Sequence, residues 1–353
     1  MCIKTFRYFL PLSACLIIAA HEAFAHHSVA GFYDPEKLIE IEGVIRNVRW
    51  RNPHTVFEVD VANDSGDVTT WIIESGALGV LRSRGLAREF VQPGDHVKIM
   101  GDSSIRSDHE MFARNMLLKN GKEVILTAGS LPYFSANDAG SILEAEYDNE
   151  TIAAARISAD GIFRVWSTNI DDRSSDRLKM FDGNYPLTES ATAQRREYDA
   201  GDQALRGCTK WTMPRIMANP LPMEFIRDGD DILQRFEEDD NVRIIHMDES
   251  SRAPSLEMSS LGYSTGRWEG DTLVIETSRL EPERFDDHGT PFSAALYLLE
   301  RFSPADGGNR LDYTLTVTDP NTFPTSLQLR RHWDWRPEIT VGAYKCEEDQ
   351  QVR

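Results

Sequence analysis

Apolar and polar residues alternate through much of this chain, which is the pattern of half-buried β-strands. Residues 38–50 (LIEIEGVIRNVRW) show the alternation clearly, and a turn containing Asn52 and Pro53 separates them from the next alternating stretch. In the first part of the chain, strands are expected at residues 38–50, 54–62, 68–75, 96–101, 110–118 and 122–126. The pattern therefore predicts a small, strand-rich domain here.

One helix interrupts these strands. Residues 77–90 carry apolar side chains at helical spacing, namely Leu78, Leu81, Leu86 and Phe90. Three strands, a helix and then two strands is the order of an OB-fold, a small Greek-key barrel. Residues 26–130 are therefore predicted to form an OB-like β-barrel domain. Residues 131–160, which combine small and turn-forming residues with an acidic patch, are predicted to be a linker.

The rest of the chain is again rich in short strands. They are expected at residues 162–168, 224–238, 241–248, 266–278, 295–303, 310–319, 327–335 and 339–346. Hairpin turn chemistry recurs between them, as in Asp228-Gly229-Asp230 and Glu269-Gly270-Asp271. Residues 161–353 are therefore predicted to form an antiparallel β-barrel or sandwich, with residues 170–215 covering one end. The fold class as a whole is expected to be mainly β.

The first 25 residues read as a secretory signal peptide. Lys4 and Arg7 give a positive start, residues 9–20 are apolar, and Ala23-Phe24-Ala25 fits a cleavage site. Cleavage there would export the protein to the periplasm or the outside and make His26 the first mature residue. Two alternatives are a lipoprotein signal, in which Cys15 is lipidated, and a retained anchor, which the shortness of the apolar run disfavours.

The net charge limits the expected binding partners, and the cysteine content predicts a disulfide. The 353-residue chain carries a formal net charge of −19, which disfavours nucleic-acid binding and binding to an anionic membrane surface. The basic clusters are expected to be solvated faces; they comprise Arg46, Arg49, Arg51, Arg82, Arg84 and Arg88. Of the four cysteines, Cys208 and Cys346 remain after signal removal and are predicted to form a disulfide, the alternative being two free thiols.

Two segments resemble families. HHSVAGFYDPEKLIEIEGVIRNVRWRNPHTVFEVDV resembles an uncharacterised family of exported bacterial domains that start with His-His-Ser and carry Asn-Pro-His in the first hairpin. The second half, with GRWEGDTLVIET and HGTPFSAALYLLERF, is similar to another uncharacterised exported family, marked by its Arg-Trp-Glu-Gly-Asp-Thr-Leu and Glu-Arg-Phe strings. That family usually opens with Ser-Gly-Val-Trp, where this chain has residues 163–166 as Phe-Arg-Val-Trp. Neither resemblance implies an activity.

Histidines near the mature terminus form a candidate copper site. The α-amine and imidazole of His26, with His27 and the hairpin residue His54, offer the nitrogen donors that suit copper. His54 would reach the terminus if the first strand packs back onto the barrel. The alternative is a frayed terminus, with His54 capping a turn through Asn52.

A second candidate site lies in the C-terminal sheet. Glu300, with His288 or His332, could act as a general acid and base if these side chains face one cavity. The alternative is a structural ion pair between Glu300 and Arg330 or Arg331.

Aromatic residues of the same sheet form a third candidate site. They are Trp268, Tyr297, Phe302, Trp333 and Trp335, which could line an apolar ligand pocket or simply pack in the core. The chain has no GxSxG, P-loop, GxGxxG, HExxH or EF-hand pattern.

Three functions follow from these sites. The leading hypothesis is an exported protein that binds a small apolar or amphipathic ligand, without nucleic-acid partners or stable membrane insertion. The alternatives are a copper-binding protein and an acid–base enzyme, either a hydrolase or an isomerase.

Overall fold

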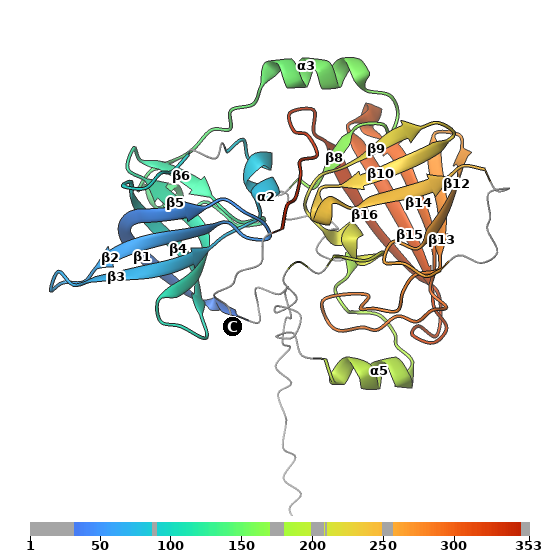
Figure 1. The fold of residues 1–353 in the computed structure, drawn as a ribbon, viewed down its shortest axis with the longest axis horizontal. Helices are drawn as coiled ribbons and strands as arrows, with labels where there is room; N and C mark the ends of the chain where they lie inside the picture. The colour runs from blue at the N-terminus through green and yellow to red at the C-terminus, as the bar shows by residue number, and fades with distance from the viewer. Residues whose placement is uncertain are drawn as a thin grey trace, which may run out of the picture.

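The computed structural model describes residues 32–86, 90–169, 180–198, 208, 210–248 and 257–346. The expected signal peptide with Cys15, the histidines His26 and His27, and Arg88 lie outside the described residues. The described chain forms two β-rich domains that lie side by side (Figure 1). Among the described residues, no helix is both long and apolar enough to cross a membrane.

The first domain is a small barrel of the predicted OB-like type. Its strands are β1 (Tyr33–Arg49), β2 (Val56–Ala62), β3 (Val68–Glu74), β4 (His96–Ser104), β5 (Glu110–Leu118) and β6 (Lys122–Ile125). Strand β1 pairs with both β2 and β4, and a parallel pairing of β3 with β5 closes the ring. Phe57, Ile73 and Ile99 are completely buried in its core, as the alternating pattern requires.

The helix of this domain is shorter than predicted. Helix α2 (Leu78–Ser83) ends before Gly85, whose positive φ of 70° is a left-handed conformation that terminates helices. Leu86 is buried nonetheless, because the chain folds back after the glycine.

The region predicted as a linker contains regular structure. Strand β7 (Ser141–Ile142) adds to β6, and helix α3 (Asn149–Ser158) follows. The Asp148 carboxylate accepts hydrogen bonds from the backbone N–H groups of Glu150 and Thr151, which caps the helix. Helix α3 buries none of its residues and runs above the space between the two domains (Figure 1).

The second domain is a closed barrel of nine strands. These are β8 (Val165–Ser167), β9 (Met223–Asp228), β10 (Asp231–Phe236), β11 (Val242–His246), β12 (Tyr263–Glu269), β13 (Thr272–Ser278), β14 (Tyr297–Ala305), β15 (Arg310–Thr318) and β16 (Leu327–Trp335). The remaining elements are helix α5 (Glu189–Arg196) and short 3-10 turns at Ser135–Asn137, Arg215–Ala218, Glu238–Asp240 and Asp306–Gly308.

Two expectations for this domain need correction. Strands β11 and β12 pair in parallel, with Ile245 opposite Ser264 and His246 opposite Thr265, whereas an antiparallel sheet was expected. Residues 339–346, predicted as a last strand, do not join the barrel. They run between the two domains (Figure 1), where Cys346 forms a single parallel bridge with Asn52.

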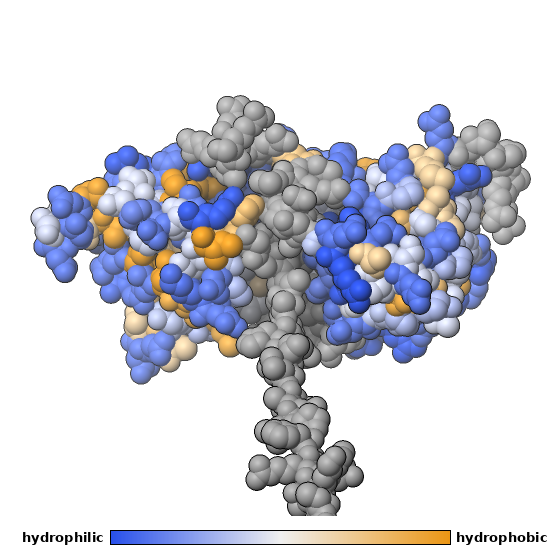
Figure 2. Space-filling view, turned by 90° about the horizontal axis from the view of Figure 1, so that it is seen from below, coloured by the Kyte–Doolittle hydropathy of each residue, from blue (hydrophilic) through white to orange (hydrophobic). Residues whose placement is uncertain are grey.

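The predicted disulfide is present. Cys208 and Cys346 are bonded, with Cα atoms 5.7 Å apart. The bond therefore ties this interdomain segment, rather than a barrel strand, to the connection between β8 and β9 of the second barrel. On the face that Figure 2 shows, the surface of both domains is largely hydrophilic, with scattered apolar residues.

Candidate functional site

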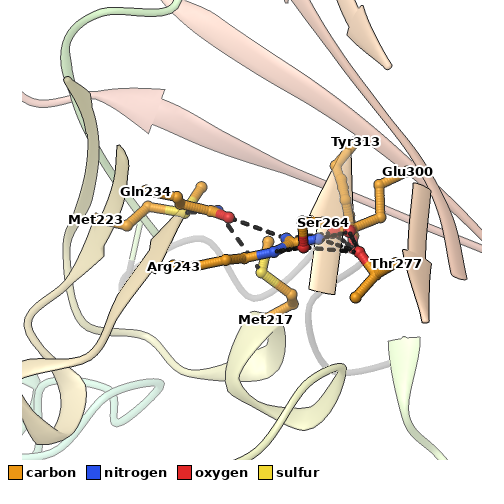
Figure 3. Close-up of polar contacts among 8 residues, drawn as sticks. All are labelled: Met217, Met223, Gln234, Arg243, Ser264, Thr277, Glu300 and Tyr313. Carbon is orange, nitrogen blue, oxygen red and sulfur yellow. Dashed lines mark hydrogen bonds and ion pairs between the residues drawn. The ribbon is translucent and has the colours of Figure 1, made fainter. Parts of the chain in front are cut away.

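A polar network occupies the inside of the second barrel, where Arg243 and Glu300 form a buried ion pair (Figure 3). Arg243 Nε donates to Ser264 Oγ at 2.8 Å, and Arg243 Nη1 donates to Gln234 Oε1 at 3.1 Å. Tyr313 donates its hydroxyl to Glu300 Oε1 at 2.9 Å. Burial and the neighbouring Glu300 carboxylate hold the pKa of Tyr313 well above its ordinary value.

The network is completed by weaker acceptors and by apolar packing. Gln234 Nε2 donates to the sulfur of Met223 at 3.4 Å, and Thr277 lies within hydrogen-bond reach of both members of the ion pair. The rings of Trp166 and Trp333 are buried in the same core. Since these side chains fill the barrel and bond one another, its interior is a structural core.

Glu300 therefore has a partner that the sequence did not identify. The predicted ion pair with Arg330 or Arg331 is replaced by the pair with Arg243 from β11. Arg331 instead donates to the Met217 carbonyl and to Thr168 Oγ1. Strands β11 and β14 are separated in the barrel by β12 and β13, and the two residues are 57 positions apart in the sequence, so sequence spacing carried no signal for this pair.

The structure does not bring Glu300, His288 and His332 together. His332 lies between Arg331 and Trp333 on β16, and because those two are buried inside the barrel, His332 lies on the outer face. His288 lies in a turn organised by Asp286, whose Oδ1 accepts hydrogen bonds from the backbone N–H groups of His288 and Thr290 at 3.0 and 2.9 Å.

Asp286 also accepts a hydrogen bond from a tyrosine hydroxyl. Tyr185 donates its hydroxyl to the Asp286 carboxylate, and burial, reinforced by that carboxylate, holds the pKa of Tyr185 well above its ordinary value. Asp286 is fully buried. The hydrogen bonds of Asp286 therefore hold the loop of residues 286–288 in place.

The five aromatic residues predicted to line one pocket divide between two faces. Phe302 and Trp333 are buried inside the barrel with their ring centroids 6.2 Å apart. Trp268 and Tyr297 lie on the outer surface, 43% and 37% exposed, and Trp335 is half-buried beneath the Arg164 guanidinium. The structure thus does not assemble these five residues into a single pocket.

His54 lies beside a carboxylate at the edge of the first barrel. Its Nδ1 is 3.0 Å from Glu74 Oε2, and its ring contacts Phe112 edge-on. Tyr33, at the start of β1, also hydrogen-bonds Glu74. The turn-capping role through Asn52 is not observed, because the Asn52 side chain bonds Leu78 N and the Tyr344 carbonyl.

A cleft of about 360 Å³ lies between the two domains, and none of the residues that line it is among the predicted site residues. The first domain and the segment after it contribute a mainly apolar wall; its residues are Ser83, Arg84, Leu86, Glu123, Val124, Ile125, Ile142, Leu143, Ala145 and Tyr147. The second domain contributes a polar wall, which consists of Asn169, Asp334, Arg336 and Glu338.

A hydrogen bond across the cleft connects its two walls, because Arg336 Nη2 donates to the Ser83 carbonyl at 2.8 Å. Within the first wall, Tyr147 donates its hydroxyl to the same carbonyl at 2.9 Å. Arg336 Nε also pairs with Glu338. This orients the Arg336 guanidinium at the junction of the domains.

Glu123 is a fixed acceptor at the cleft. Burial raises the pKa of its carboxyl, but hydrogen bonds from the Ser135 hydroxyl and the backbone N–H groups of Tyr133 and Ser135 outweigh this and lower it below the ordinary value. Glu123 therefore stays a carboxylate that anchors the chain after β6.

Sequence reasoning missed this cleft because its lining comes from segments far apart in the chain. The one signal in the sequence is the basic cluster that contains Arg82 and Arg84, although such a cluster is also typical of a solvated face. Arg84 lines the cleft, and Arg82 forms an ion pair with the second domain.

One family model matches the chain. It describes a family of unknown function, DUF6152, and covers residues 14–110, that is, the later part of the expected signal region and most of the first barrel. This agrees with the resemblance of the N-terminal segment to an uncharacterised family. No curated protein matches the chain.

Proposed function

We propose that this protein is an exported binding protein that holds one small amphipathic molecule in the cleft between its two domains. The observation that carries the proposal is the cleft itself, with a volume of about 360 Å³ and unlike walls. Ligand sites typically measure about 300–1,000 Å³ and often lie at domain interfaces.

The two walls define the kind of ligand. Ile125, Ile142 and Leu143 offer an apolar surface on one side, and Ile142 is 38% exposed. Asn169, Asp334 and Arg336 offer hydrogen-bonding groups on the other side. A molecule with an apolar body and a polar end would satisfy both walls at once.

Export is supported by independent features. The signal pattern of residues 1–25 directs a chain across a membrane, and the disulfide between Cys208 and Cys346 is of a kind that persists in oxidising compartments. We therefore place the protein in the periplasm or outside the cell. There, diffusible amphipathic molecules are available to the cleft.

A fluorescent probe tests the cleft. The amphipathic dye 1-anilinonaphthalene-8-sulfonate should bind with a stoichiometry of one, and Ile142→Asp should weaken binding at least tenfold. Ile244→Asp is the matched control, because Ile244 is an exposed isoleucine on the outer face of the second barrel. Equal affinities in the two variants would contradict the proposal, as would native mass spectra showing no dye on the folded protein.

Copper binding is a second candidate function, favoured by the surroundings of His54. Glu74 holds His54 Nδ1 at 3.0 Å, the arrangement that orients metal-ligating imidazoles through their second nitrogen. Tyr33 bonds the same glutamate, so the described chain begins beside His54. The seven peptide units that connect His26 to Tyr33 can span up to about 25 Å. In this proposal, the His26 amine and imidazole join His54 on copper.

The described residues contain no group of three or more His, Cys, Asp or Glu side chains placed to hold a metal. The copper proposal therefore depends on the mature terminus, and its test targets that end. One equivalent of Cu(II) added to the processed protein should give a nitrogen-rich EPR spectrum. An additional residue before His26, or His54→Ala, should change it, whereas His109→Ala should not. A spectrum that is the same in all variants would remove this candidate.

Acid–base catalysis is not part of the proposal. The Glu300 carboxylate is bonded to Arg243 and Tyr313 inside the barrel, and His332 lies on the other face of the barrel wall.

A further inference from the structure

The C-terminal segment, residues 339–346, lies between the two barrels and contacts both of them (Figure 1). Its Tyr344 side chain is buried in a small apolar cluster with Val80 of the first barrel and Leu221 of the second. The Tyr344 carbonyl accepts a hydrogen bond from Asn52 Nδ2 at 2.5 Å. The segment is therefore a shared part of the interface between the domains.

An acidic turn of the second barrel holds this segment through its backbone. Glu237 Oε2 accepts from Gly342 N at 2.9 Å, and Asp240 Oδ1 accepts from Tyr344 N at 2.9 Å. Glu237 Oε1 also pairs with Arg82 Nη2 of the first barrel at 2.6 Å. The Glu237 carboxylate therefore contacts both the C-terminal segment and the first barrel.

Close packing at Gly342 reinforces this contact. A Cβ atom at Gly342 would lie 2.5 Å from Arg82 Nη2, so the guanidinium rests directly against the segment's backbone. Displacing the segment would therefore remove the surface against which Arg82 is placed.

The disulfide links the C-terminal segment covalently to the chain around Cys208. Cys346 ends the described segment and is bonded to Cys208. Just after Cys208, Trp211 N donates to Asp239 Oδ2 at 2.7 Å, in the same acidic turn. The bond thus joins two chain segments that are each held by residues 237–240.

We propose that the Cys208–Cys346 disulfide is a redox latch for the two-domain arrangement. While the bond is intact, residues 339–346 stay between the barrels and hold them together. A dithiol reductant transfers two electrons and two protons to the bond, yields two cysteine thiols and is itself oxidised to a disulfide. The segment then leaves the interface and the two barrels separate.

The latch also bears on the cleft, a consequence that rests on the proposed function. Arg336 and Glu338 of the polar wall immediately precede the segment, and Arg336 bonds Ser83 of the first barrel. Release of the segment separates the two walls. Reduced protein should therefore lose binding of the anilinonaphthalene dye, even though every residue of the cleft is still present.

Hydrogen exchange tests the latch without any ligand. The folded, oxidised full chain is treated with dithiothreitol at 25 °C and followed by mass spectrometry. Amides of residues 78–83 and 339–346 should exchange at least tenfold faster after reduction, while those of β14 should not change. The Cys208→Ser/Cys346→Ser double variant should resemble the reduced protein and should not respond to dithiothreitol.

The outcomes separate the two proposals. Unchanged exchange of residues 78–83 and 339–346 after complete reduction would overturn the latch. Faster exchange with unchanged dye binding would keep the latch and contradict binding in the cleft. If the double variant does not fold, reduction of the folded wild-type protein still decides the question.

Discussion

At the residue scale, buried carboxylates differ according to their neighbours. Glu300 faces an arginine inside the barrel, whereas Glu238 is buried in the acidic turn beside Asp239. Burial, reinforced by Asp239, raises the pKa of Glu238 to about 8. Glu238 is therefore the buried glutamate whose titration should make stability depend on pH.

The first prediction concerns Glu238. Between pH 4.5 and about 8, the folded protein keeps a proton on this side chain that the unfolded chain releases. The contribution of Glu238 to the free energy of unfolding is therefore most favourable at low pH. It falls as pH rises, by up to about 1.4 kcal/mol per pH unit. Glu238→Gln should reduce this slope in urea unfolding measured at pH 5, 6.5 and 8.

An exposed glutamate provides the control for that measurement. Glu281→Gln removes a carboxyl on the surface of the same domain and should leave the slope unchanged. The turn also contains Glu237 and Asp239, whose pKa values are raised by burial, so part of the slope should remain in Glu238→Gln. A slope identical to that of the wild type would show that Glu238 is not protonated in the folded protein.

The second prediction concerns the ion pair inside the barrel. Glu300→Gln leaves the Arg243 guanidinium buried without its counter-charge and should cost about 3–5 kcal/mol of unfolding free energy. The double variant Arg243→Met/Glu300→Leu should be more stable than Glu300→Gln, because no uncompensated charge remains. Urea unfolding monitored by tryptophan fluorescence measures both.

The exposed pair between Arg301 and Glu269 is the matched comparison on the same sheet. Its removal by Glu269→Gln should change stability little, because water solvates both groups. A comparable loss in Glu269→Gln and Glu300→Gln would contradict the assignment of Glu300 to a buried pair.

At the element scale, the first barrel depends on a close approach between β4 and β5. A Cβ atom at Gly101 would lie 2.2 Å from the Phe112 carbonyl oxygen, at a shift in the strand register. Because backbone cannot move aside as a flexible side chain can, this position accepts only glycine without displacing a strand.

The third prediction follows from this contact. Gly101→Ala should destabilise the protein by about 2–3 kcal/mol through overpacking of the strand pair. In Gly94→Ala, the methyl group meets no atom within 4 Å, so only the positive φ of 95° opposes the change. Thermal unfolding of the two variants should place Gly101→Ala lower, and the reverse order would contradict the clash.

At the scale of the whole molecule, Asn52 connects three parts of the structure. It is completely buried, accepts a hydrogen bond from Leu78 N at 2.9 Å and donates one to the Tyr344 carbonyl. The side chain thus joins the first barrel to the start of α2 and to the C-terminal segment between the domains.

The fourth prediction is that Asn52→Ala costs about 2–4 kcal/mol, because it removes the side-chain partner of the Tyr344 carbonyl in a buried contact and of the half-buried Leu78 N–H. The same variant should speed hydrogen exchange in residues 339–346. Asn47→Ala is the control, since Asn47 is exposed on strand β1, which ends shortly before Asn52. Equal stability of the two variants in urea would show that Asn52 does not hold the interface.

The sequence by itself determined the local structure of this protein. Alternating residues located the strands of both barrels, such as β2 and β15, because one buried face imposes a period of two. Strand order indicated the OB-like barrel, and the two remaining cysteines indicated the disulfide. Residues 339–346 were misassigned as a strand because a segment buried between two domains shows the same apolar alternation.

Only the tertiary structure decided which distant residues meet. The pairing of Arg243 with Glu300 requires a closed barrel, and the cleft requires the placement of Ser83 beside Arg336. Spacing along a chain carries no information on such contacts, because they depend on how closed sheets pack against each other. The same limit explains why the predicted aromatic set divided between the two faces of the barrel, while the candidate ligand site emerged between the domains.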